Sequence, residues 1–162
     1  MKGSINMLYI VKAVLSCIRD EIRQFAIRVD PSSSVNYGGL VQRDALYASC
    51  YFISSDDMIT QKEIDLISDI SGEQLDAVAV SGMIVNRNAL IEMIRETYTE
   101  LKKLDLLAGT YNKRSSTAYQ YIKALESFVG FVSGIDGVKR TELVEIKDVF
   151  QPFEEEISLI PA

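Results

Sequence analysis

One stretch of the chain is repeated 79 residues further on without a gap. Residues 52–63 align with residues 131–142, and the matches continue outward as far as Asp69 over Asp148. Each copy reads as an apolar helix, an acidic turn and a second apolar helix. Such helix pairs cannot bury their apolar faces alone, so two of them are expected to pack around one core.

The apolar pattern predicts helices almost throughout. Only three prolines occur, two of them at positions 152 and 161, so no obligatory helix breaker lies between about residue 40 and residue 150. The fold class predicted is all-α, a compact bundle of about six to seven helices built from an internal two-fold repeat of helix-turn-helix units. Helices are expected at about residues 4–28, 41–54, 60–71, 74–83, 87–108, 116–133 and 140–150. Residues 153–157 form either a last helix or a junction to a further domain.

The domain organisation follows from one loop-like stretch. Residues 31–40 are rich in serine and glycine and read as a linker. An amphipathic helix over residues 1–30 precedes the linker, and the bundle over residues 41–162 follows it. Within that bundle the two repeats cover about residues 41–71 and 120–150.

The composition excludes several chemistries. The chain has no histidine, which removes imidazole ligands and the Ser-His-Asp and Cys-His machineries. Cys17 and Cys50 are isolated from each other and are too few for a zinc site. The formal charge of −6 disfavours contact with nucleic-acid phosphates, and the basic, aromatic cluster at residues 111–121 reads better as a solvated loop leading into a helix. We therefore expect no enzymatic activity and no nucleic-acid partner.

The sequence of the first helix also indicates where in the cell the protein is expected. Residues 7–18 are apolar enough to resemble the core of a signal peptide, but Lys12 lies in the middle of them and the helical pattern continues through residues 20–25. This favours an ordinary amphipathic helix. No run approaches the roughly 20 apolar residues of a membrane span, so a cytoplasmic protein without membrane insertion is expected.

The two acidic turns are the candidate functional sites. Asp57 precedes Glu63 by six positions, and Asp136 precedes Glu142 by the same interval. Oxygen-rich turns of this kind can hold a hard cation such as Ca²⁺ or Mg²⁺. Each turn alone has too few ligands, but the two together with Asp56 could form one metal site across the two-fold axis of the repeat.

A structural role for the same residues is the alternative. Thr60 and Glu63 have the spacing of a capping box, and acidic residues near a helix N-terminus complement its dipole. In the second copy Asp136 can close a turn, with Gly137 free to adopt a positive φ. The sequence leaves both interpretations open.

The turn pattern resembles a known family. The order aromatic-aliphatic-small-x-x-Asp-Gly-aliphatic-x-x-x-Glu, at residues 131–142 and less completely at residues 52–63, resembles the TerB-like family of bacterial tellurite-resistance and stress proteins over about residues 41–153. The resemblance implies an all-helical bundle built by internal duplication and a link to divalent cations. The chain departs from the family pattern at Met58, where glycine is favoured. Carried over position by position, the cation ligands implied are Asp57, Glu63, Asp136 and Glu142, with Asp56 as an extra carboxylate.

Family membership would also imply a non-enzymatic role. TerB-like domains occur alone or attached to ATPases, chaperone-type modules and membrane proteins in stress and phage-defence contexts. The function expected is therefore an interaction or scaffold module for a protein partner, or for a second copy of this chain. The alternatives are a divalent-cation sensor and a Mg²⁺-dependent carboxylate-cluster hydrolase, for which only Lys139 and Arg140 lie near the second turn as substrate anchors.

Overall fold

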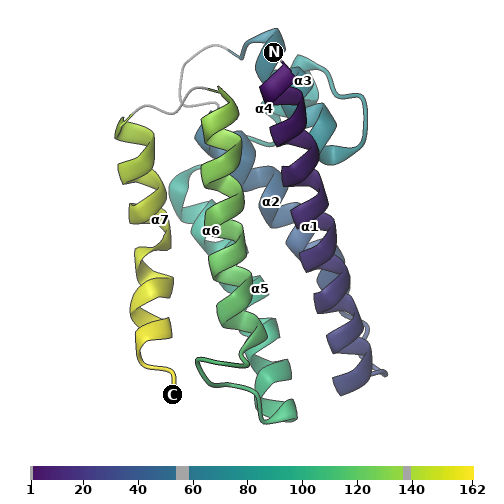
Figure 1. The fold of residues 1–162 in the computed structure, drawn as a ribbon, viewed down its shortest axis with the longest axis vertical. Coiled ribbons are helices and arrows are strands. Elements are labelled where there is room, and N and C mark those ends of the chain that lie inside the picture. Colours follow the sequence, from purple (N-terminus) through teal and green to yellow (C-terminus); the bar gives the residue numbers. More distant parts are fainter. Residues whose placement is uncertain (1, 54–58, 137–139) are drawn as a thin grey trace.

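The chain is all-helical, as the sequence predicts. The computed structural model describes residues 2–53, 59–136 and 140–162, and these form seven α-helices and no strand (Figure 1). In chain order the helices are α1 (Lys2–Val29), α2 (Tyr37–Ile53), α3 (Gln61–Ser71), α4 (Ala77–Ser81), α5 (Arg87–Ala108), α6 (Thr117–Asp136) and α7 (Arg140–Ser158).

Two helices form the centre of the bundle. α2 packs against α1, α3, α5 and α6, and α6 packs against α1, α2, α5 and α7. Figure 1 shows α1, α6 and α7 as long, roughly parallel rods. The core between the helices is rich in large side chains, among them Tyr98, Tyr121, Phe150 and Phe153. Burying each such side chain stabilises the fold by about 1.5–3 kcal/mol.

Helix α1 packs as part of this bundle. Leu15, Ile22 and Ala26 are buried in the same core as the other helices, and α1 lies against both α2 and α6. None of the described helices is long and apolar enough to cross a membrane.

The residues expected to link α1 to the bundle are partly helical. α2 begins at Tyr37, four residues before the start expected at 41. Asn36 caps it, because its side-chain oxygen accepts a hydrogen bond of 2.9 Å from the amide of Gly39. An asparagine before a helix satisfies one of the amides left without a partner in the first turn. The connecting loop is therefore shorter than the composition indicated.

Helix α7 runs past its expected end and through a proline. It continues to Ser158 with Pro152 inside, whereas the sequence placed its end near residue 150. An internal proline costs about 3 kcal/mol. Phe153 and Ile157, which the continuation places in the core, each return about 1.5–3 kcal/mol. Tertiary burial thus offsets the local preference.

The two proposed repeat units are both helix-turn-helix segments. α3 begins at residue 61 and α7 at residue 140, which matches the 79-residue offset of the sequence alignment. α2 packs on α3, α6 packs on α7, and α2 and α6 pack on each other. The second helices differ, however, with 11 residues in α3 and 19 in α7. Internal duplication stays a prediction.

Candidate functional site

The acidic turns lie largely outside the described residues. Asp56 and Asp57 are among the residues that the structure does not describe, and so is the loop that follows Asp136. Asp136 is the last residue of α6, and Glu142 lies in the first turn of α7. The predicted meeting of the two turns around one cation therefore falls outside the described part of the chain and stays a prediction.

Glu63 is the candidate ligand whose surroundings are described, and it forms the predicted capping box. Its Oε1 accepts hydrogen bonds from the backbone amide of Thr60 at 3.3 Å and from the Thr60 hydroxyl at 2.9 Å. In return the Glu63 amide donates to the Thr60 hydroxyl oxygen at 3.2 Å. These contacts satisfy amides at the start of α3. The carboxylate thus has a structural role in the fold.

The second carboxylate oxygen of Glu63 is not used by the cap. The residue is 5% exposed, and among the described residues its buried Oε2 has no hydrogen-bond partner. A buried acceptor left without a partner is costly. Among the described residues no three acidic or cysteine side chains lie close enough together to hold a metal ion.

The most elaborate polar cluster surrounds a buried aspartate that sequence reasoning did not select. Asp44 of α2 is fully buried, and its carboxylate accepts hydrogen bonds from Thr97 of α5 and Tyr121 of α6. Arg43 Nε donates a hydrogen bond of 3.1 Å to the other oxygen of Asp44, and Nη2 forms an ion pair with the same oxygen at 3.0 Å. Three helices are therefore joined at one carboxylate.

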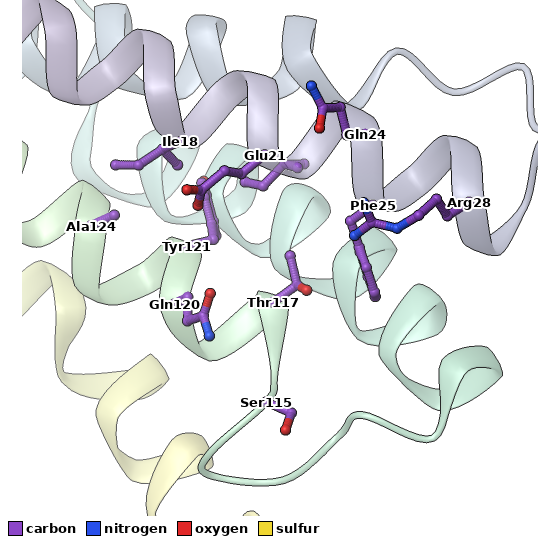
Figure 2. Close-up of a pocket in the computed structure, with 11 residues that line it drawn as sticks. Ile18, Glu21, Gln24, Phe25, Arg28, Ser115, Thr117, Gln120, Tyr121 and Ala124 are labelled. Atoms are coloured by element: carbon purple, nitrogen blue, oxygen red, sulfur yellow. The ribbon is translucent and has the colours of Figure 1, made fainter.

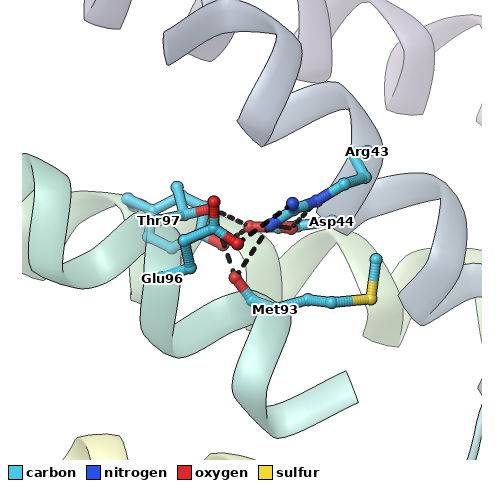
Figure 3. Close-up of polar contacts among 6 residues, drawn as sticks. Arg43, Asp44, Met93, Glu96 and Thr97 are labelled. Atoms are coloured by element: carbon cyan, nitrogen blue, oxygen red, sulfur yellow. Dashed lines mark hydrogen bonds and ion pairs between the residues drawn. The ribbon is translucent and has the colours of Figure 1, made fainter. Parts of the chain in front are cut away.

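Arg43 extends this cluster to the surface. Nη1 donates to a carboxylate oxygen of Glu96 at 3.2 Å, and Nη2 donates to the backbone carbonyl of Met93 at 3.1 Å (Figure 3). Arg43 is half-buried, and Glu96 is exposed. The guanidinium thus neutralises Asp44 from the solvent side while fixing α2 to α5.

Burial dominates the electrostatics of Asp44. Desolvation raises the pKa of its carboxyl to about 6, although the hydrogen bonds from Thr97 and Tyr121 and the charge of Arg43 act in the opposite direction. Burial and the neighbouring carboxylate also raise the pKa of the Tyr121 hydroxyl well above its usual value. The phenol therefore remains a proton donor to Asp44 at ordinary pH.

One sequence signal could have identified Asp44. Val41, Ala45 and Ala48 are the buried residues around it on α2, so Asp44 is a single charge within a helical apolar stripe. A charge at such a position is rarely buried without a partner. Its partners at positions 97 and 121 are far away in the chain, and no local pattern indicates them.

A second buried carboxylate organises the start of α6. The two oxygens of Asp105 accept hydrogen bonds from the amides of Thr117 at 2.9 Å and Ala118 at 3.0 Å. They also accept from the hydroxyls of Thr110 and Ser116, each at 2.8 Å. The amides at this helix N-terminus are thus satisfied within the protein. This carboxylate is a helix cap supplied by the preceding helix.

The N-terminal half of α1 carries an exposed apolar face. Tyr9 is 77% exposed, Ile10 53% and Val14 40%, and Cys17 is exposed as well. Positions 10, 14 and 17 follow the four- and three-residue spacing of one helix face. We call these four residues the α1 face. On another side of the same helix, Leu15 and Ile22 are buried in the core.

The fold and the polar clusters around Asp44 and Asp105 define an all-helical bundle whose helices are joined by buried carboxylates. No protein-family model, curated protein or solved structure matches the chain. The TerB-like resemblance therefore stays a prediction that rests on the turn pattern.

Proposed function

We propose that this chain is a non-enzymatic interaction module whose α1 face binds a protein partner. The observation that carries the proposal is the exposure of Tyr9, Ile10 and Val14 on one continuous helix. Apolar side chains gathered on a surface are a feature of protein-binding sites, and tyrosine is enriched among the residues that contribute most to binding.

The hydrogen bonds made by the buried carboxylates support a binding role over a catalytic one. Asp44 and Asp105 each accept several hydrogen bonds from neighbouring helices, and Glu63 caps α3. Carboxylates held in this way stabilise the bundle. The stress or phage-defence context implied by the resemblance is part of the same proposal.

Capture of partners with matched variants tests the proposal. We would immobilise the wild-type protein, Ile10→Asp and Val78→Asp, and compare the proteins retained from an extract of the source cells. Val78 is 80% exposed on α4, so it controls for the loss of an exposed valine elsewhere. A partner retained by the wild type and by Val78→Asp but lost with Ile10→Asp is the expected result. Equal retention by all three proteins would contradict the proposal.

The same variants separate a foreign partner from self-association. Light scattering coupled to size-exclusion chromatography gives the mass of each protein in solution. A wild-type dimer that becomes a monomer in Ile10→Asp would identify a second copy of the chain as the occupant of the α1 face. A monomer in both proteins directs the search to the captured partner.

A second candidate function is a response to Ca²⁺ or Mg²⁺. The buried Oε2 of Glu63, which has no hydrogen-bond partner in the described part of the chain, supports it, because a cation would satisfy an oxygen that the cap does not use. Calorimetric titration of the metal-free protein and of Asp57→Asn and Asp136→Asn tests this candidate. Saturable heat that disappears in either variant is expected, and the absence of heat in the wild type would exclude it.

A further inference from the structure

A cavity of about 400 Å³ opens between the C-terminal half of α1 and the start of α6. Figure 2 shows its lining, with Glu21, Phe25 and Arg28 contributed by α1 and with Thr117 and Gln120 contributed by α6. Ligand sites in proteins commonly have volumes of about 300–1,000 Å³. The cavity is therefore large enough for a small ligand.

The lining of this cavity combines apolar and polar side chains. Phe25 is half-buried against the core, and the ring of Tyr121 lines the cavity while its hydroxyl donates to Asp44. Gln120 is exposed at the rim. Its side chain makes no hydrogen bond to another described residue, so both its donor and its acceptor are available.

The α1 side of the lining carries two residues of opposite charge. Glu21 and Arg28 are seven residues apart, which places them on the same helix face with about 10 Å between them along the axis. Both are exposed, and within the described chain neither forms an ion pair. The cavity thus offers a carboxylate and a guanidinium from residues two turns apart on α1, with Phe25 between them in the chain.

Phosphates and other simple anions fit this site poorly. The first amides of α6 already have acceptors within the described chain. Asp105 accepts from the amides of Thr117 and Ala118, and the Ser116 hydroxyl oxygen accepts from the backbone amide of Tyr119 at 3.0 Å. The Glu21 carboxylate would also repel a multiply charged anion. A ligand with one charge of each sign, separated by an apolar body, is the better match.

We propose that this cavity binds a free peptide of about three residues with an apolar central side chain. An extended chain spans about 3.3–3.6 Å per residue, so three residues match the roughly 10 Å that separates Glu21 from Arg28 along the axis of α1. The peptide's terminal ammonium pairs with Glu21, and its terminal carboxylate accepts hydrogen bonds from the Arg28 guanidinium in the fork geometry typical of arginine. The central side chain lies on Phe25, and the side-chain amide of Gln120 forms hydrogen bonds with the peptide backbone.

This site goes beyond the proposed function and does not depend on it. The residues of the α1 face, 9 to 17, precede the cavity residues 21 to 28 on the same helix. Loss of partner capture with Ile10→Asp and loss of peptide binding at the cavity are separate results, and either can fail alone.

Titration followed by ¹H–¹⁵N NMR tests the proposal directly. The probe is Ala-Phe-Ala with free termini, and the comparison ligands are its N-acetylated, C-amidated form and the dipeptide Ala-Phe. Saturable shifts at the amides of residues 21–28 and 115–124 are expected with the free tripeptide. Blocking both termini or shortening the peptide is expected to weaken binding by at least tenfold.

Variants of the charged ends complete the test. Glu21→Gln and Arg28→Gln are each expected to weaken tripeptide binding about three- to tenfold, the range for one partly exposed ion pair with good hydrogen bonds. Arg23→Gln is the matched control, because Arg23 pairs with Asp20 and does not line the cavity. All three positions are exposed, and circular dichroism confirms that each variant is folded. Shifts confined to other surfaces, equal affinity for the blocked peptide or no binding at millimolar tripeptide would each overturn the proposal.

Discussion

Replacing Asp44 with asparagine is expected to flatten the dependence of stability on pH. The carboxyl has its pKa raised by burial to about 6 from an ordinary value of 3.8. Because the folded protein holds this proton more tightly than the unfolded chain does, the contribution of Asp44 to stability is full below pH 3.8. That contribution falls as the pH rises and is lost above about 6.

The size of this effect follows from the two pKa values. A tenfold change in proton affinity is worth about 1.4 kcal/mol, so the whole contribution is about 3 kcal/mol. About 1.4 kcal/mol of it is lost between pH 5.0 and pH 7.5. Asparagine does not titrate, and its side-chain oxygen can still accept the hydrogen bonds from Thr97 and Tyr121.

Urea unfolding followed by circular dichroism at pH 5.0, 6.0, 6.75 and 7.5 measures the effect. Glu126 has its pKa raised to about 7 by burial and by its contact with Glu154, and it adds a slope of the same sign. The diagnostic quantity is therefore the difference between the wild-type and Asp44→Asn curves. Glu96→Gln, which alters only the surface partner of Arg43, is the control and should keep the wild-type slope. Parallel curves for the wild type and Asp44→Asn would refute the reasoning.

Three further substitutions test the packing and the caps, each by the change in the free energy of unfolding in urea. Phe153→Ala should cost about 3–5 kcal/mol because it leaves a cavity in the core, and a loss below 1 kcal/mol would mean that α7 is not packed as described. Thr60→Ala should cost about 1 kcal/mol through loss of the α3 cap, with Ser at the same position restoring most of it; an unchanged stability would show that the cap contributes nothing. Asp105→Asn should cost about 3 kcal/mol, because the asparagine NH2 group replaces an oxygen that accepts two charge-assisted hydrogen bonds and so places a donor opposite two donors. An unchanged stability would show that Asp105 does not organise the start of α6.

The sequence predicts elements well where local signals and burial agree. Residues 87–108 were expected as one helix, and α5 has those bounds. Local end signals bound its apolar stripe on both sides. Asn86 caps the start, where its side chain accepts a hydrogen bond of 2.8 Å from the Ala89 amide, and Gly109 follows the end with a φ of 71°. Only glycine adopts that conformation without strain. The capping box of α3 was predictable for the same reason, because all of its parts lie within four residues.

The sequence predicts less where distant contacts decide the outcome. Pro152 indicated a helix end, but burial of Phe153 extends α7 beyond it. Asp44 gave a weak signal as one charge in an apolar stripe, yet its meeting with Thr97 and Tyr121 depends on how three helices pack. The cavity between α1 and α6 depends on that packing as well, so local periodicity could not reveal it.

Photo-crosslinking in living cells tests the α1 face most directly. A benzophenone amino acid placed at Tyr9, which is 77% exposed, can react only with a molecule that contacts this face. The same group at Leu159, which is 83% exposed near the C-terminus, is the matched control. One discrete protein adduct from position 9, absent from position 159 and abolished by Ile10→Asp, is the predicted result. No adduct from position 9, or the same adducts from both positions, would contradict the account of this chain as an interaction module that binds through α1.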